Sequence, residues 1–344
     1  MNKIGVIGVG YWGPNLVRNF MSLGAFDEVI ACDPDAERLR AVCQRFPGLR
    51  ACGDAAELLA EPDVEAVAIA TPVRYHHELA KRALQAGKHV LIEKPMTQTA
   101  QQARELISLA AQRGRTLMVD HTFLFTGAVE KIHEIVSAGE LGECYYVDSV
   151  RVNLGLFQSD VDVIWDLAPH DLSIVGHVSG AKPKRVQAIG RKHAGPHMVD
   201  VAYLHVDYDS GFTASFHVNW LSPTKIRRML FAGSKRMIVW DDLEAAEKVR
   251  VYDKGVELQE AGQDEQYRLR VGYRMGDAWL PQIDVTEALR KMAAHFVDCY
   301  RGGKRPICAG EDGLDVVNVL EASRLSLDNS GRAVVIEGER IALA

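Results

Sequence analysis

A glycine pattern near the start of the chain constrains its fold more than any other feature. The apolar run Ile4 to Val9 is typical of a buried parallel strand, and Gly8-x-Gly10-x-x-Gly13 leads from it into a helix. Gly8 permits the tight turn, Gly10 lets a pyrophosphate approach the backbone, and Gly13 lets the helix pack on the strand. The pattern predicts a dinucleotide-binding turn in which the free N–H groups of the helix face the phosphates.

Residues beside the glycines indicate which dinucleotide binds. Tyr11 and Trp12 lie inside the loop, and we expect both to contact the cofactor. Asp33 ends the second apolar run, where an acid accepts hydrogen bonds from the adenosine ribose and repels a 2′-phosphate. This favours NAD over NADP, although Arg38 close by tempers that preference. The alternative is an α/β turn that binds no nucleotide.

Strands and helices alternate through the first third of the chain. The runs "AVAIAT", "VLIE" and "TLMVD" read as buried strands, separated by amphipathic stretches with helical spacing. The alternation predicts a doubly wound parallel sheet, whose ligands bind at the carboxyl ends of the strands. We expect contacts with cofactor or substrate from the residues at or just after these ends: Thr71, Pro72, His76, Glu93, Lys94 and His121.

From about Thr122 the pattern changes to long alternating strands. These predict an open-faced, mainly antiparallel sheet, with hairpin turns at Asp209-Ser210-Gly211 and Asp253-Lys254-Gly255. The predicted fold class is therefore α/β, a Rossmann domain over residues 1–121 followed by an α+β domain over residues 122–344. His205-x-Asp207 and His217-x-Asn219 favour a polar sheet face or subunit contact, and we predict no metal site.

Composition excludes several classes of function. The net charge is −6 and basic residues form no block, so nucleic acid is a poor candidate partner. No apolar run is long enough to span a bilayer, and the N-terminus enters a strand-like run without the layout of a signal peptide. The six scattered cysteines fit reduced thiols, so we expect a cytoplasmic protein.

Two stretches carry candidate catalytic side chains. In "WDLAPHD", Asp166 and His170 lie four positions apart, and Pro169 suits a first helical turn. We expect the helix to begin near Leu167 to Pro169, so that its positive end keeps His170 neutral and able to accept a proton. The alternative is an N-capping aspartate followed by a buried histidine. Lys94 is either a cation that holds a substrate hydroxyl or a solvated lysine of a loop.

Four motifs in this order, "GVGYWG", "ATPVRYHH", "AGKHVLIEKP" and "WDLAPHD", resemble the glucose–fructose oxidoreductase/inositol dehydrogenase/MocA family of sugar dehydrogenases. The resemblance implies that Lys94 lies at the nicotinamide and the substrate hydroxyl, with a cis bond to Pro95. It implies that His170 is the acid/base and that Asp166 either orients it or holds the sugar. It also implies dimers or tetramers formed through the free face of the second sheet. We expect further substrate contacts from His121 and Asn153.

The second half contains "NLGLFQSDVDVIWDLAPHD", "NWLSPTKIRR", "YDKGVE" and "YRMGD". With these stretches it resembles family members that oxidise C3 of UDP-N-acetylglucosamine-type sugars in surface polysaccharide or lipopolysaccharide biosynthesis. Four basic residues are either ligands of the diphosphate or surface charges: Lys225, Arg227, Arg228 and Arg274. The alternatives within the same chemistry are a dehydrogenase of a free polyol or sugar, such as inositol, and a keto-sugar reductase. An alternative of another class is a non-catalytic sensor that binds NAD.

Overall fold

The computed structural model describes residues 2–155, 157, 160–195, 198–259 and 270–344. The chain forms two compact units, Met1–Thr126 with Thr286–Glu321, and Gly127–Val285 with Ala322–Ala344. The boundary expected after His121 leaves both C-terminal helices in the second domain. Here α8 (Ala288–Gly302) and most of α9 (Gly310–Asp328) belong to the first unit, because the apolar side of α8 packs against helices of that unit.

The first unit is the expected doubly wound parallel sheet. Its strand order is β3-β2-β1-β4-β5-β6, so the direction of winding reverses between β1 and β4. The strands are β1 (Lys3–Ile7), β2 (Glu28–Cys32), β3 (Arg50–Cys52), β4 (Val64–Ile69), β5 (His89–Glu93) and β6 (Leu117–Asp120). The helices between them are α1 (Gly13–Leu23), α2 (Ala36–Arg45), α3 (Ala55–Ala60), α4 (His76–Gln85) and α5 (Ala100–Arg113), with short 3-10 turns η1 (Val73–Tyr75) and η2 (Thr122–Phe125).

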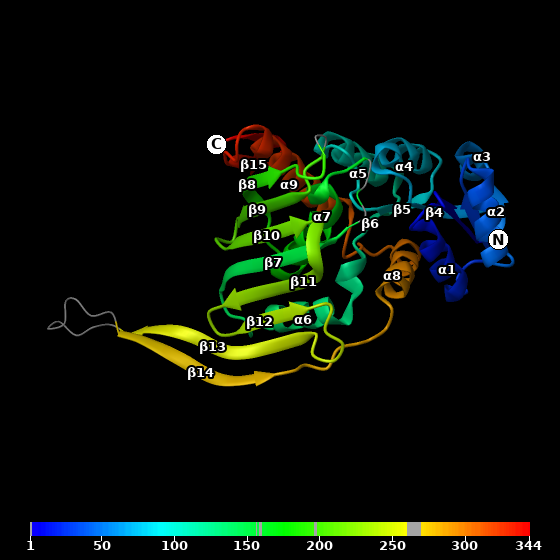
Figure 1. Ribbon diagram of the computed structural model, residues 1–344. Helices are drawn as coiled ribbons and strands as arrows, with labels where there is room; N and C mark the ends of the chain where they lie inside the picture. The colour runs from blue at the N-terminus through cyan, green and yellow to red at the C-terminus, as the bar shows by residue number, and fades with distance from the viewer. Residues whose placement is uncertain (1, 156, 158–159, 196–197, 260–269) are drawn as a thin grey trace. The chain divides into compact units, whose positions relative to one another are not determined.

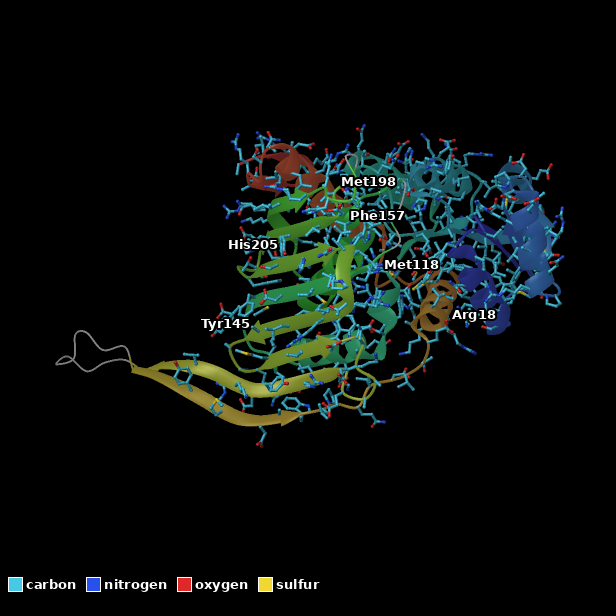
Figure 2. All side chains as sticks on the ribbon, viewed as in Figure 1. Arg18, Met118, Tyr145, Phe157, Met198 and His205 are labelled. Carbon is cyan, nitrogen blue, oxygen red and sulfur yellow. The ribbon has the colours of Figure 1, made fainter. Side chains whose placement is uncertain are left out.

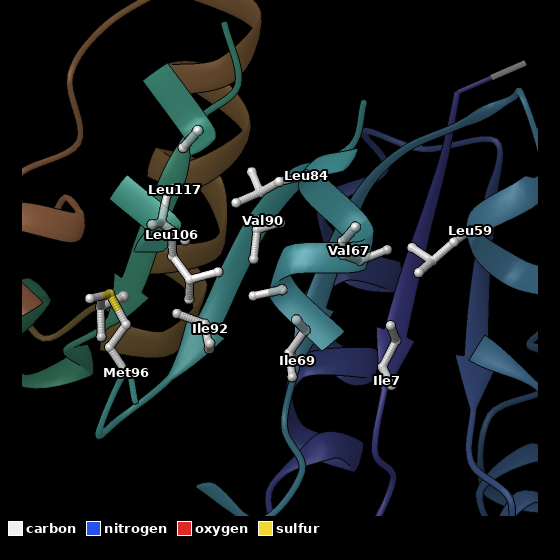
Figure 3. Close-up of a cluster of buried hydrophobic side chains, with 14 of the residues drawn as sticks. Ile7, Leu59, Val67, Ile69, Leu84, Val90, Ile92, Met96, Leu106 and Leu117 are labelled. Atoms are coloured by element: carbon white, nitrogen blue, oxygen red, sulfur yellow. The ribbon is translucent and has the colours of Figure 1, made fainter. Parts of the chain in front are cut away.

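Branched side chains from the strands of this sheet form its core. Ile69 and Ile92, from neighbouring strands, are fully buried, and Leu84 from α4 and Leu106 from α5 belong to the same cluster (Figure 3). Strands buried on both faces explain why the sequence shows continuous apolar runs here instead of alternation. Packing of this core therefore determines where each strand ends. The polar residues that follow the strands lie at that edge of the sheet.

The second unit is built on a mixed, mainly antiparallel sheet (Figure 1). Its strand order is β14-β13-β12-β11-β7-β10-β9-β8-β15-β16, and β7 pairs parallel to β10. The strands are β7 (Cys144–Leu154), β8 (Pro183–Arg191), β9 (Val201–Tyr208), β10 (Thr213–Asn219), β11 (Leu221–Gly233), β12 (Met237–Asp241), β13 (Val249–Gln259), β14 (Arg270–Trp279), β15 (Val334–Glu337) and β16 (Arg340–Leu343). The unit also contains α6 (Gly127–Ser137) and α7 (Val163–Ser179), and α7 packs on β7, β9 and β10.

One of the two predicted hairpin turns is confirmed and the other is wrong. Gly211, with φ 93°, lies in the turn between β9 and β10. At Asp253-Lys254-Gly255 the chain does not turn, and β13 continues through it to Gln259. The pairing of β13 with β14 shifts register between Tyr252 and Lys254, and Arg274 of β14 donates to the Asp253 carboxylate at 2.7 Å. The polar residues therefore form a strand irregularity, and β13 and β14 extend as a two-stranded arm (Figure 1).

Among the described residues, no helix combines the length and the apolar character needed to cross a bilayer.

Candidate active site

The glycine-rich loop after β1 has the shape of a phosphate-binding turn. Gly8 has φ 93°, and a Cβ there would come within 2.7 Å of the Ala70 carbonyl oxygen. A Cβ on Gly13 would come within 2.0 Å of the Gly8 carbonyl oxygen, so helix and strand pack too closely for a side chain. The space beside Gly10 is open, with Arg38 Nη1 the nearest atom at 3.9 Å. The start of α1 has no side-chain cap and no acidic residue, so its N–H groups suit an anion.

Asp33, at the end of β2, organises this loop and suits a ribose. One carboxylate oxygen accepts the N–H of Val9 at 2.9 Å and the other accepts the N–H of Asp35 at 2.9 Å. Each oxygen keeps a second lone pair for a ribose hydroxyl. Arg38 pairs with Asp35 at 3.3 Å, which places its charge close to the same edge. Tyr11 is 85% exposed in the loop, while Trp12 is half-buried.

His76 connects the segments that follow β4 and β5. It is 1% exposed, and its Nε2 lies 2.8 Å from the Thr71 carbonyl oxygen while its Nδ1 lies 3.0 Å from the Pro95 carbonyl oxygen. Pro72 is the N-cap residue of η1, and the Lys94–Pro95 peptide bond is cis. His76 therefore holds the Thr71–Pro72 turn against the Lys94–Pro95 segment, which is a supporting role at the cofactor edge.

Charged and ionisable groups cluster at the ends of β5 and β6. Lys94 follows Glu93 at the end of β5, His121 follows Asp120 at the end of β6, and the register pairs Glu93 with Asp120. In this cluster Lys94 affects the pKa of Glu93, Asp120 and His121. Burial, and then Lys94, lower the pKa of His121 to about 3, which keeps its ring neutral at physiological pH. Burial and the Asp120 carboxyl raise the pKa of Glu93 well above its ordinary value. Asp120 had no role in the sequence analysis, since its coupling to Glu93 depends on strand register.

In the second unit, the helix that carries the Asp-His pair begins earlier than expected. The expected start near Leu167 to Pro169 is wrong, because α7 begins at Val163. Asp162 is its N-cap and accepts the N–H groups of Ile164 and Trp165, both at 3.0 Å. Pro169 lies inside the helix, where the Trp165 carbonyl loses its usual N–H donor.

This start places His170 beyond the first turn of the helix. The residue is half-buried and lies two turns into α7, whereas the helix dipole acts within the first turn. The expected dipole effect on His170 therefore does not apply. Asp166 lies in that first turn and one helical turn before His170, so both side chains share a face of α7.

Asp166 is held by a residue that the sequence analysis missed. Trp220 Nε1 donates to Asp166 Oδ2 at 3.2 Å, and the indole is 1% exposed. A Cβ on Gly155 would come within 2.6 Å of the indole, and the Phe157 ring packs against it at 5.1 Å between centroids. Trp220 follows Asp166 by more than fifty positions, so no local spacing announces the contact.

A buried ion pair anchors α7 on the sheet beside His170. Arg151 donates to Asp171 Oδ1 through Nε at 2.9 Å and Nη2 at 2.6 Å, and Ser149 donates to Asp171 Oδ2 at 2.8 Å. Arg151 and Asp171 are 3% and 2% exposed. Asn153 lies two positions after Arg151, on the same face of β7. The ion pair therefore holds Asp171, the residue after His170, against the sheet face that also carries Asn153.

The four basic residues considered for a diphosphate have different surroundings. Arg227 pairs with Asp242 at 3.3 Å, and Arg274 binds Asp253 and the carbonyls of Ser234 and Lys235. These contacts fit a structural role for both arginines. Lys225 and Arg228 are exposed on β11.

On the second sheet, the exposed His205 and the half-buried His217 contact neighbours across strands. His205 lies 2.8 Å from Thr213 Oγ1 and 3.2 Å from Ser215 Oγ, and His217 stacks on Tyr203 at 4.4 Å between ring centroids. Figure 2 shows the side chains of His205 and Tyr145 extending from β9 and β7. Across the residues that the structure describes, no group of three or more potential ligands is arranged for a metal ion.

Two family models match the chain. The first, an oxidoreductase family with an NAD-binding Rossmann fold, matches residues 2–121, and the second, the GFO/IDH/MocA C-terminal domain, matches residues 129–239. The first unit is thus an NAD-binding domain, in agreement with its glycine loop and Asp33.

Individual relatives differ in substrate. The UDP-N-acetylglucosamine 3-dehydrogenase of Acidithiobacillus ferrooxidans is 33% identical over 71% of this chain and 73% of its own. The D-apiose dehydrogenase of Paraburkholderia graminis is 25% identical over 97% of this chain and 90% of its own. A solved structure of the first of these enzymes has a TM-score of 0.77 and 27% identity, and covers 95% of this chain and 97% of that one.

Proposed function

The chain belongs to the GFO/IDH/MocA oxidoreductase family, and we propose that it oxidises a secondary sugar hydroxyl to a ketone, at C3 of a UDP-N-acetylglucosamine-type nucleotide sugar. The position of Lys94 carries the proposal. It stands at the end of β5, on the sheet edge that holds the glycine loop and Asp33, beside a buried neutral histidine. A protein that only sensed NAD would have no need of a cation there.

The proposal gives each catalytic side chain a task. Bound NAD supplies the hydride acceptor. His170 accepts the proton of the reacting hydroxyl, and Lys94 stabilises the negative charge that develops on the oxygen. Asp166, held by Trp220, either orients His170 or binds a neighbouring hydroxyl. His121 and Asn153 are proposed substrate contacts.

The substrate class rests on similarity to the UDP-N-acetylglucosamine 3-dehydrogenase, which exceeds 30% identity over most of the chain. On this basis we place the reaction in surface polysaccharide or lipopolysaccharide biosynthesis. The free thiols of all six cysteines support a cytoplasmic location. The similarity to D-apiose dehydrogenase supports a second candidate, oxidation of a free sugar or polyol.

Turnover and binding together test the proposal. Purified protein with NAD should produce NADH with UDP-N-acetylglucosamine and not with inositol or D-apiose. Lys94→Ala and His170→Asn should each retain NAD binding and lose turnover by roughly a hundredfold or more. Lys81→Ala and His77→Asn, which alter side chains bound to Glu105 on the surface, are the matched controls and should retain turnover.

Each alternative predicts a different result. NADH formed only with a free sugar or polyol would select the second candidate. NAD binding without turnover on any sugar would favour the sensor. Normal turnover in either Lys94→Ala or His170→Asn would remove that residue from the mechanism.

A further inference from the structure

Two buried carboxyl groups meet at the cofactor edge of the first unit. Glu93 and Asp120 are directly paired in the parallel register of β5 and β6, so their side chains leave the sheet on the same side. They are 9% and 1% exposed, and each carboxyl group affects the pKa of the other. Two ionised carboxylates side by side without water are strongly disfavoured, so the environment favours a pair that holds one proton.

The hydrogen bonds around the pair show where a proton is needed. Glu93 Oε2 accepts the N–H of Lys94 at 3.2 Å, and Asp120 Oδ1 accepts the hydroxyl of Thr122 at 2.5 Å. The other two oxygens, Glu93 Oε1 and Asp120 Oδ2, are buried and accept no hydrogen bond from the described part of the chain. An ionised carboxylate can only accept, so one proton on either oxygen satisfies both.

The groups that face the pair are a cation and neutral side chains. Lys94 lowers the pKa of both carboxyls, and His121 is neutral because burial and Lys94 lower its pKa to about 3. The indole of Trp12 lies against Asp120, and the Cys308 thiol beside it stays protonated because burial raises its pKa. A pair that holds one proton therefore presents one negative charge, opposite the positive charge of Lys94.

The position of Glu93 and Asp120 in the sheet indicates which end of a bound cofactor they would face. Asp33 on β2 places the adenosine ribose towards β2, and the glycine loop after β1 places the pyrophosphate at the start of α1. The nicotinamide half of bound NAD would then lie over β4, β5 and β6. Trp12, in the glycine loop, lowers the pKa of Asp120, and neither ring nitrogen of the buried His121 has a hydrogen-bond partner among the described residues. A polar group of a ligand would satisfy that ring.

We propose that Glu93 and Asp120 share one proton and present a single negative charge to the nicotinamide, which makes the site favour oxidised NAD over NADH. The oxidised ring is a cation and the reduced ring is neutral. Lys94 alone would repel the oxidised ring, and the shared carboxylate offsets that repulsion. This inference rests on the NAD-binding domain and not on the identity of the sugar, so failure of the substrate assignment leaves it standing.

Amide substitutions test whether the proton is shared. In Glu93→Gln the amide oxygen keeps the Lys94 N–H, and the new N–H₂ group faces Asp120 Oδ2. In Asp120→Asn the amide oxygen keeps the Thr122 hydroxyl, and the N–H₂ group faces Glu93 Oε1. Each single variant therefore replaces the shared proton with an amide proton and leaves one carboxylate. The double variant leaves no charge at all.

The measurement is the ratio of the dissociation constants for NAD and NADH, by calorimetry and NADH fluorescence without substrate. Both single variants should keep this ratio within about twofold of the wild type, and the double variant should shift it on the order of tenfold towards NADH. An unchanged ratio in the double variant would contradict the claim that the pair presents a negative charge to the nicotinamide. A shift in one single variant as large as that in the double variant would contradict the claim that the two carboxyl groups share a proton. Loss of both NAD and NADH binding makes the pair structural and also overturns the proposal.

A second measurement needs no double variant. As the pH rises above neutral, loss of the shared proton should increase the wild-type preference for NAD. Neither single amide variant has that proton, so both should lack this step, while any titration of Cys308 would remain in all three proteins. Identical pH profiles in the wild type and the single variants would overturn the proposal.

Discussion

At the scale of single residues, the buried Glu93 should make folding depend on pH. Burial raises its pKa well above the usual 4.5, so the folded protein keeps a proton that the unfolded chain releases. Stability from this group is complete below about pH 4.5 and falls as the pH rises towards the folded pKa, by up to about 1.4 kcal/mol per pH unit. Glu93→Gln should therefore gain in melting temperature over the wild type as the pH rises, in a thermal unfolding series.

The surface residue Glu105 provides the control for this series. Its hydrogen bonds with Lys81 and His77 lower its pKa, so its stabilising effect is already complete above its usual pKa and is lost only at lower pH. The melting temperature of Glu105→Gln should change with pH in parallel with that of the wild type from about pH 5 to pH 8. A Glu93→Gln curve that is also parallel to the wild type would contradict the buried-proton account.

Sequence reasoning found the residues whose place depends on one strand end, and missed those that depend on pairing. Lys94 and His121 each follow an apolar run, so the run alone predicts their position at the sheet edge. Asp120 acquires its role from the register with Glu93, and Trp220 acquires its role from contact with Asp166. A single sequence carries no signal for either contact, because each joins segments that are distant along the chain.

At the scale of elements, α7 shows that aspartates suited to the N-cap do not by themselves locate the start of a helix. Asp162 and Asp166 are both suitable N-caps, and Pro169 made the later start look favourable. Asp162 is the N-cap in the structure, and Val163, Ile164 and Trp165 are then buried as the first helical turn. Burial of these apolar residues favours the earlier start and opposes the cost of a proline inside the helix, and neither effect is visible in local spacing.

The cap at Asp162 should contribute to both stability and turnover. Asp162→Ala removes the acceptor for the N–H groups of Ile164 and Trp165, so it should destabilise the protein by about 1 kcal/mol in urea unfolding. Fraying of the first turn would also displace Asp166 and lower the proposed turnover. Asp160→Ala, an exposed acid of the same loop, is the matched control and should change neither. Equal stability of the two variants would argue against the cap.

At the scale of the whole molecule, the fold class was predictable and the assignment of the last helices was not. Alternating runs indicated a parallel sheet first and an antiparallel sheet second, and both are confirmed. An amphipathic helix such as α8 shows which of its faces is apolar, but not which core that face joins. The return of α8 and most of α9 to the first unit is therefore a tertiary result that periodicity cannot supply.

The second sheet should mediate self-association. Alternate residues of β8 and β9 are buried, whereas Ile189 and Tyr203 between them remain 58% and 55% exposed beside a shallow depression. Apolar side chains grouped on a sheet face are typical of an interface, and a stable one needs roughly 800 Å² from each partner.

We expect the wild type to have at least twice the mass of one chain in light scattering. The double variant Ile189→Lys with Tyr203→Lys should reduce this mass to that of one chain, because buried lysine charges disfavour contact. Tyr75→Lys, an exposed aromatic of the first unit, should keep the wild-type mass, and an unchanged mass in the double variant would refute this interface.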